Sequence, residues 1–213
     1  MAQKIAVIDY GMGNLRSVVK AIEHVADGAL VRATDDPAFI AQADRVVFPG
    51  QGAARDCMAA IGDHHLNQAI VGAAADKPFL GICMGLQVLM VQSEENDGTS
   101  LLGLFAGDVR RFDGLAQGDN GLPLKIPHMG WSQVHQVLPH PLWDGIADQS
   151  RFYFVHSYRV VPEDGTLIAA TTDYGVRFTS AVARDNLFAT QFHPEKSADA
   201  GLRLLENFVN WSL

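Results

Sequence analysis

The sequence predicts an α/β domain in which helices cover both faces of a mostly parallel central sheet, giving three layers, followed by a β-rich second half. Three observations support this fold class. Short apolar runs alternate with helical patterns over about the first hundred residues, as expected for βαβ units. Loops that contain glycine lie near the ends of three of these runs. After about residue 100, strand-like runs follow one another with little helix between them.

The first half of the chain supplies the parallel strands and the helices that connect them. Apolar runs predict strands over residues 4–9, 29–32, 45–48 and 78–82. Helical spacing of apolar residues predicts helices over residues 15–25, about 57–75 and about 84–93. Because ligands bind beyond the carboxyl ends of strands in such sheets, the loops at 11–14 and 49–52 should meet Cys83 around one cleft.

The second half predicts six more strands and a final helix. The strands cover residues 108–112, 131–138, 151–161, 166–171, 180–184 and 187–191. The polar, glycine-rich segment 113–122 predicts an exposed loop, and apolar spacing predicts a helix from residue 198 to about 211. Since no repeat or linker divides the chain, we expect residues 1–213 to form a single domain.

Composition and charge narrow the functions to consider. The chain has 213 residues, a formal net charge of −8 and two cysteines, Cys57 and Cys83. The negative charge argues against nucleic-acid binding, which needs a basic surface. No apolar stretch approaches the roughly 18 residues of a membrane-spanning helix, and the first residues lack the regions of a signal peptide. We expect a cytoplasmic protein with reduced cysteines, too few of them for a structural zinc site.

The segment Gly81-Ile82-Cys83-Met84-Gly85 predicts a nucleophile. It has the form G-x-C-x-G between an apolar strand and a helical pattern, which is a nucleophile elbow with cysteine in place of serine. Glycines on either side remove Cβ atoms that would clash at the sharp turn. The helix N-terminus favours the thiolate, and the amide after the cysteine can serve an oxyanion hole. The alternative, a buried and inert cysteine, is our expectation for Cys57, which has no such glycines around it.

One short loop supplies the expected partners of this thiol. A thiol at its usual pKa is only slightly ionised at neutral pH, so it needs a neighbouring base. His193 follows an apolar strand and precedes Pro194 and Glu195, so the carboxylate can reach back to orient the imidazole. His64 and His65 are adjacent on a predicted helix, where their side chains diverge, so we expect neither to bind a metal.

The segments around these residues resemble the class I glutamine amidotransferases. GICMGLQ at residues 81–87, QFHPEKS at 191–197 and the PGQG loop at 49–52 carry that resemblance. IDYGMGNLRSV at 8–18, PHMGW at 127–131 and YFVHSY at 153–158 are further similar to the glutaminase subunits of histidine biosynthesis. The resemblance covers about residues 4–211. It departs at Ser132, where asparagine is common, and at Gln51, where a small apolar residue is more usual.

The resemblance implies a reaction and a partner. Cys83 would attack the carboxamide of L-glutamine, and His193, oriented by Glu195, would protonate the departing ammonia. The ammonia would pass to a (β/α)₈-barrel cyclase that forms imidazole glycerol phosphate and an aminoimidazole carboxamide ribotide. No metal or organic cofactor is implied.

The same resemblance implies roles for residues around the triad. The oxyanion hole and its loop would comprise Gly50, Gln51, Gly52 and Met84. Glutamine would be held by Gln87, Glu95, Ser157 and Tyr158, with His156 in the same segment. The cyclase would contact Asn14, Arg16, Trp131 and Lys196, and its binding would reorient the Gly50–Gln51 peptide.

Other functions stay open on the sequence. The same elbow could serve a stand-alone γ-glutamyl hydrolase or a thiol peptidase, either of which would be fully active without a partner. A non-catalytic binding module is a third alternative, against which intact Cys83, His193 and Glu195 argue. A glutaminase subunit of another pathway differs from the expected protein only in its subfamily segments.

Overall fold

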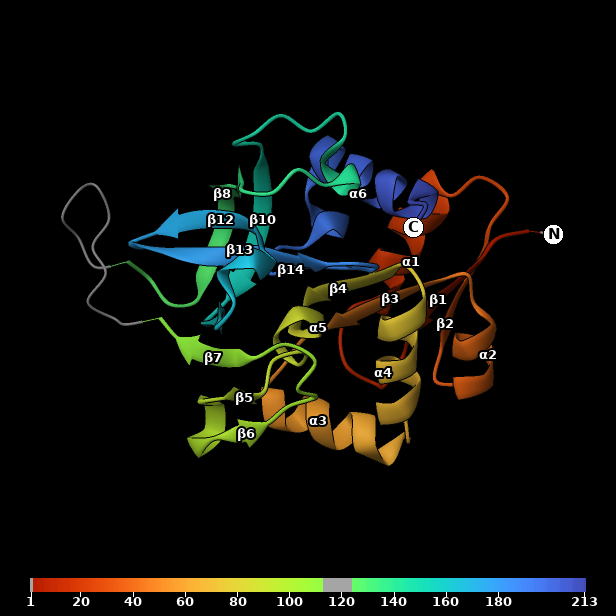
Figure 1. Cartoon of the computed structure of the whole chain (residues 1–213), viewed down its shortest axis with the longest axis horizontal. Helices are drawn as coiled ribbons and strands as arrows, with labels where there is room; N and C mark the ends of the chain where they lie inside the picture. Colours follow the sequence, from red (N-terminus) through yellow and green to blue (C-terminus); the bar gives the residue numbers. More distant parts are fainter. Residues whose placement is uncertain (1, 113–123) are drawn as a thin grey trace.

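A central sheet with helices on both faces organises the molecule (Figure 1). The structure, a computed structural model, describes residues 2–112 and 124–213; the loop predicted at 113–122 therefore lies outside the described residues. Five neighbouring strands are parallel, which confirms the predicted fold class. In spatial order they are β2 (Leu30–Thr34), β1 (Lys4–Ile8), β3 (Arg45–Gly50), β4 (Phe79–Cys83) and β14 (Leu187–Thr190).

The strands of the second half extend this sheet mainly in antiparallel fashion. Beyond β14 lie β13 (Val176–Arg184), β11 (Tyr158–Pro162), β7 (Gly107–Arg111), β5 (Gln92–Ser93) and β6 (Thr99–Ser100). The strand β12 (Ile168–Tyr174) pairs with β13 and with β9 (His135–Gln136). A separate two-stranded sheet consists of β8 (His128–Gln133) and β10 (Arg151–His156).

Two predictions of a single strand, over residues 131–138 and 151–161, are wrong. Residues 131–138 contain the end of β8 and all of β9, which belong to different sheets. Residues 151–161 form β10 and β11, which also belong to different sheets, and the chain crosses between them at Ser157. Phe152 and Phe154 of β10 turn into the core beneath the main sheet, whereas Val160 of β11 joins the core on its opposite face. A continuous apolar pattern could not separate two strands that bury their side chains in different places.

Two apolar layers fix the helices to the sheet. On one face lie α1 (Leu15–Val25) and α6 (Ala198–Asn210), which contact each other. The other face carries α2 (Pro37–Gln42), α3 (Ala54–Asp63), α4 (Asn67–Asp76) and α5 (Met84–Gln87). Short 3₁₀ turns occupy Glu95–Asp97, Pro141–Trp143, Gly165–Leu167 and Pro194–Lys196. In the described part of the chain, every helix is too short or too polar to cross a bilayer.

Two helical predictions need correction, and one helix was missed. The long helix over about 57–75 is two helices, α3 and α4, because His65 adopts φ 56° and ends α3. The helix from Met84 to about residue 93 stops at Gln87, since the carbonyls of Val88, Leu89 and Met90 bond to amides of residues 102–105. The short helix α2 was not predicted.

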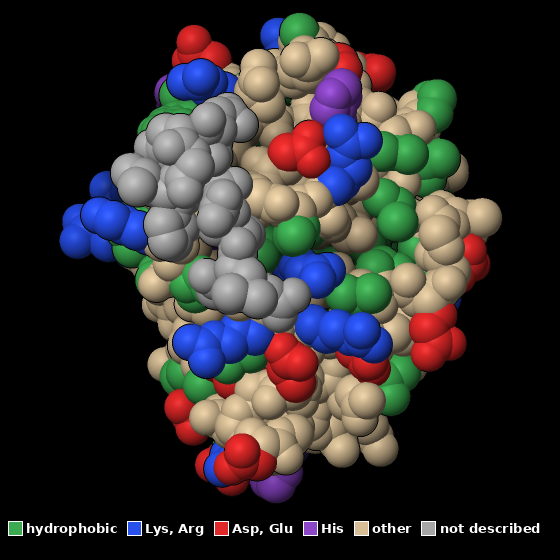
Figure 2. All heavy atoms as spheres, turned by 90° about the vertical axis from the view of Figure 1, so that its left-hand side faces the viewer, with side chains coloured by type: hydrophobic (Ala, Val, Ile, Leu, Met, Phe, Trp, Pro, Cys, Tyr) green, Lys and Arg blue, Asp and Glu red, His purple; other side chains and the backbone are tan. Residues whose placement is uncertain are grey.

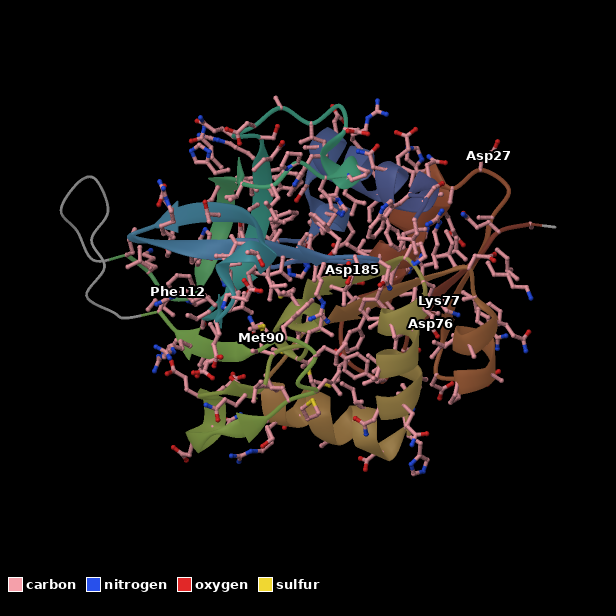
Figure 3. All side chains as sticks on the ribbon, in the orientation of Figure 1. Asp27, Asp76, Lys77, Met90, Phe112 and Asp185 are labelled. Carbon is pink, nitrogen blue, oxygen red and sulfur yellow. The ribbon has the colours of Figure 1, made fainter. Side chains whose placement is uncertain are left out.

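Lys77 joins α2 to the end of α4. Its Nζ donates to the carbonyls of Ile40, Ala41 and Ala43 at the end of α2. Figure 3 shows Lys77 beside Asp76, where α4 approaches α2. Lys77 thus caps the end of α2, at the amino ends of the parallel strands.

Candidate active site

The chain turns from β4 directly into α5 at Cys83, which forms a nucleophile elbow. Cys83 adopts φ 56° and ψ −105°, a strained conformation for a residue with a side chain. A Cβ added at Gly85 would lie 1.8 Å from the carbonyl oxygen of Phe48, and one at Gly81 would lie 2.8 Å from that of Gly85. Both glycines of the predicted elbow are therefore required by close packing of the turn.

His193 and Glu195 form a buried pair. His193 Nδ1 lies 2.8 Å from Glu195 Oε1, and both side chains are 2 % exposed. Because a carboxylate only accepts, Nδ1 carries the proton, and Nε2 has no hydrogen-bond partner within the described residues. The backbone of His193 is fixed as well, since its N–H donates to Tyr153 and its carbonyl accepts from the hydroxyl of Ser197.

The surroundings of His193 favour its protonated form. Burial by itself lowers the pKa of this imidazole, but the opposing charge of the Cys83 sulfur and then Glu195 together raise the pKa to about 10. A protonated His193 beside the sulfur of Cys83 places an acid next to the nucleophile.

A cavity of about 430 Å³ opens over the nucleophile and gathers most of the predicted site residues. The predicted residues that line it are Gln51, Gly52, Cys83, Met84, Gln87, Glu95, Ser157, Tyr158, His193 and Lys196. Tyr153, Val155, His156 and Pro127 complete its wall. Two further predicted residues lie next to this lining. Glu195 lies behind His193, and Gly50 pairs with Cys83 across β3 and β4.

The loop after β3 is held in place by residues beneath it. A Cβ at Gly50 would lie 2.1 Å from the hydroxyl of Tyr10, so only glycine fits there without movement. The carbonyl of Gln51 accepts from the buried thiol of Cys57 at 3.4 Å. Burial raises the pKa of the Cys57 thiol to about 11, so it stays protonated and able to donate. Cys57, expected from the sequence only to pack, therefore also anchors this loop.

Hydrogen bonds hold two of the predicted glutamine-binding residues, Glu95 and Gln87, in place. Glu95 Oε2 accepts from the first amide of α3, Ala54 N, at 2.7 Å. Gln87 Nε2 donates to the carbonyl of Tyr158 and to Gln191 Oε1, while Gln87 Oε1 is buried without a partner among the described residues. Gln191 in turn donates to Cys83 Sγ at 3.7 Å. Sequence reasoning missed Gln191, because a single glutamine carries no local pattern.

The predicted partner-contact residues lie on the surface to different degrees. Asn14 and Arg16 are exposed at the start of α1, where Asn14 also caps the helix by accepting from Ser17 N. Trp131 on β8 is 48 % exposed, and Lys196 is half-buried at the cavity. Neither Arg16 nor Trp131 lines the cavity.

The face of the molecule toward which β3 and β4 point carries basic side chains. Figure 2 shows Lys and Arg side chains gathered across the middle of this side, although the chain is acidic overall.

Among the described residues, no group of three His, Cys, Asp or Glu side chains is placed to hold a metal ion.

Comparison with known proteins identifies the family. Residues 6–211 match the family described as "Glutamine amidotransferase class-I". The chain belongs to the class I glutamine amidotransferases. This agrees with the resemblance of the elbow and the HPE segment.

Curated relatives narrow this family further. The chain is 59% identical over 209 residues to a protein from Aromatoleum aromaticum, covering 98% of each chain. It is 61% identical over 213 residues to one from Thiobacillus denitrificans, covering all of this chain and 93% of the relative. Both relatives are called "Imidazole glycerol phosphate synthase subunit HisH".

Solved structures show the same amidotransferase fold at low sequence identity. PurLQS from Thermotoga maritima superposes with a TM-score of 0.70 at 19% identity, covering 99% of both chains. A structure described as a glutamine amidotransferase gives 0.67 at 16% identity, covering 97% of this chain and 99% of that one.

Proposed function

We propose that residues 1–213 form a single glutaminase domain that hydrolyses L-glutamine and supplies ammonia to a cyclase. The cyclase would then form imidazole glycerol phosphate and an aminoimidazole carboxamide ribotide, in histidine biosynthesis. The observation that supports this most is the elbow Cys83 at the floor of the cavity, with the buried His193–Glu195 pair beside it. The HisH relatives support the choice of pathway.

The chemistry needs only residues of this chain. The Cys83 thiolate attacks the carboxamide carbon of glutamine, and amides of Gln51 and Met84 stabilise the oxyanion. His193 gives its proton to the departing nitrogen, so ammonia leaves and a γ-glutamyl thioester remains. Neutral His193 then takes a proton from water, which attacks the thioester and releases glutamate and the thiolate.

Substrate binding follows from the polar groups of the wall. Gln87 Oε1 has no hydrogen-bond partner in the described part of the chain, so at the cavity it can accept from the α-ammonium group of glutamine. Glu95 adds a carboxylate, while Ser157 and Tyr158 border the same space. A free amino acid has the ammonium group that these acceptors need.

The partner is a (β/α)₈-barrel cyclase that meets Asn14, Arg16, Trp131 and Lys196. Ammonia in water is mostly ammonium, which is no nucleophile, so release into a closed interface preserves its reactivity. The acidic net charge of −8 argues against a nucleic-acid partner. A cytoplasmic location is part of the proposal, because the cysteine nucleophile must stay reduced.

Steady-state glutamine turnover tests the function. We expect the purified chain with the cyclase to hydrolyse glutamine faster than the chain alone, and Cys83→Ala to abolish turnover in both cases. Equal rates with and without the cyclase would contradict coupling. Full activity of the chain alone would favour a stand-alone γ-glutamyl hydrolase instead.

A further inference from the structure

Two buried histidines and Ser132 form a hydrogen-bond chain behind the cavity wall. Ser132 Oγ lies 2.8 Å from His128 Nε2, and His128 Nδ1 lies 3.0 Å from His156 Nε2. His156 Nδ1 lies 2.7 Å from the carbonyl oxygen of Tyr158. His128 is 1 % exposed and His156 is 6 % exposed, and His156 lines the cavity.

Aromatic rings hold both imidazoles in place. His128 is stacked between Tyr174 and Phe154, with ring centroids 3.9 Å and 4.8 Å away. Phe112, labelled in Figure 3 at the end of β7, meets His156 edge-on at 5.2 Å. Burial lowers the pKa of His128 to about 4 and that of His156 to about 3, so each ring carries a single proton at neutral pH.

One carbonyl group fixes the direction of every bond in this chain. The Tyr158 carbonyl can only accept, so His156 carries its proton on Nδ1 and its Nε2 is an acceptor. His128 must then donate from Nδ1, which leaves its Nε2 as an acceptor. Within residues 2–112 and 124–213, the donor to that nitrogen is the hydroxyl of Ser132.

The chain continues from Tyr158 to the nucleophile. The same carbonyl accepts from Gln87 Nε2 at 3.2 Å, and Gln87 also donates to Gln191 Oε1 at 3.0 Å. This contact turns the amide of Gln191 so that its Nε2 faces Cys83 Sγ. Hydrogen bonds therefore link Ser132 on β8 with the sulfur of Cys83 through one shared carbonyl.

We propose that Ser132 is a positioning residue for the glutamine-hydrolysing site, acting through His128 and His156 on the Tyr158 carbonyl and the cavity wall. The inference rests on the proposed function, because the wall it positions is the one that receives glutamine. Removal of the hydroxyl leaves His128 Nε2 as a buried acceptor without a donor and frees the two rings to reorient.

Nitrogen NMR of the histidine side chains tests the geometry without any variant. Neutral histidine in water usually carries its proton on Nε2, whereas this chain requires Nδ1–H tautomers at both His128 and His156. We expect both rings to show a protonated Nδ1 and an unprotonated Nε2 at neutral pH. An Nε2–H tautomer at either ring would overturn the proposal, whether or not the protein hydrolyses glutamine.

Kinetics of Ser132→Val and Ser132→Thr, measured with the cyclase present, test the consequence. The two side chains have nearly the same shape, but only threonine keeps the hydroxyl. We expect Ser132→Val to raise KM for glutamine about fivefold, the usual effect of one lost hydrogen bond, with kcat within about twofold. Ser132→Thr should restore KM, and Gln133→Ala, an exposed neighbour on β8, should match the parent protein.

The outcomes separate this inference from the proposed function. Equal KM values for Ser132→Val and the parent protein would contradict the positioning role while leaving glutamine hydrolysis intact. Equal defects in the threonine and valine variants would assign the effect to packing and would also contradict it. If the parent protein itself fails to turn over glutamine, the proposed function fails, and the tautomers still report on the chain.

Discussion

His193 connects the two events that the active site must perform on glutamine. Its Nδ1 is committed to Glu195, so Nε2 is the nitrogen that can exchange a proton with the sulfur and with the departing nitrogen. The raised pKa means that the imidazole holds this proton until a leaving group needs it. The carboxylate therefore both orients the ring and stabilises its charge.

Replacement of Glu195 by glutamine should separate these contributions. We expect Glu195→Gln to lower kcat by roughly 10²- to 10⁴-fold, the range seen when a triad carboxylate loses its charge. Because Glu195 contributes to the raised pKa of about 10 at His193, its loss lowers that pKa. The alkaline decline of kcat should then move to lower pH, as a pH–rate profile would reveal. An alkaline limb at the same pH in both proteins would rule out this role.

The sequence predicted those functional residues whose neighbours along the chain explain them. Cys83 has its two glycines within two positions, and His193 has Glu195 two positions away, so spacing sufficed. The roles of Gln191 and Cys57 were not predicted, because they depend on contacts that folding creates. Gln191 meets Cys83 across 108 positions of sequence, which no local pattern can encode. Only the folded chain brings these residues next to the groups they contact.

At the level of elements, the four strands of the first half were predicted better than the helix ends. The end of α3 has the hydrogen bonds of a Schellman motif, with Leu66 N bonding to Ile61 O and His65 N to Gly62 O. Histidine occupies the position that glycine usually takes, so no glycine marks the end of this helix along the chain. After α5, bonds to a distant segment replace the next helical turn, and tertiary contacts override local propensity.

The small sheet of β8 and β10 should make the protein sensitive to acid. His128 and His156 have folded pKa values of about 4 and about 3, below the ordinary value of 6.5. Below about pH 6.5 the unfolded chain therefore binds more protons, and the free energy of unfolding falls as pH decreases. Each histidine contributes up to about 1.4 kcal/mol per pH unit in this window. Urea unfolding at pH 7 and pH 5 measures this, and equal stability at both values would show that the rings are not buried neutral.

At the scale of the whole molecule, the sheet topology places the site at the carboxyl ends of the parallel strands. The nucleophile, the Gly50–Gln51 loop and the His193 loop follow β4, β3 and β14, which are adjacent and parallel. Exposed Trp131 lies on β8, the strand that also carries Ser132. A partner that covers these strand ends would therefore contact the site and its supporting strand together.

Trp131 gives a direct test of where the cyclase binds. We expect Trp131→Ala to weaken cyclase binding by roughly 2 kcal/mol, about thirtyfold in Kd, as for a buried aromatic anchor of an interface. Leu30→Ala is the matched control, because Leu30 is also 48 % exposed but is the first residue of β2, at the amino ends of the parallel strands and away from Cys83. Calorimetric titration with the cyclase measures both, and equal affinities for the two variants would place the interface elsewhere.

The fate of the glutamine amide nitrogen tests the central claim most directly. The reconstituted complex would receive glutamine labelled with ¹⁵N in its amide, together with the cyclase substrate and excess unlabelled ammonium. Transfer within the complex predicts ¹⁵N in the imidazole product at nearly the enrichment of the glutamine, and none when Cys83→Ala replaces the parent chain. Product nitrogen diluted to the enrichment of the ammonium pool, with glutamine still consumed, would contradict delivery of ammonia to a cyclase partner.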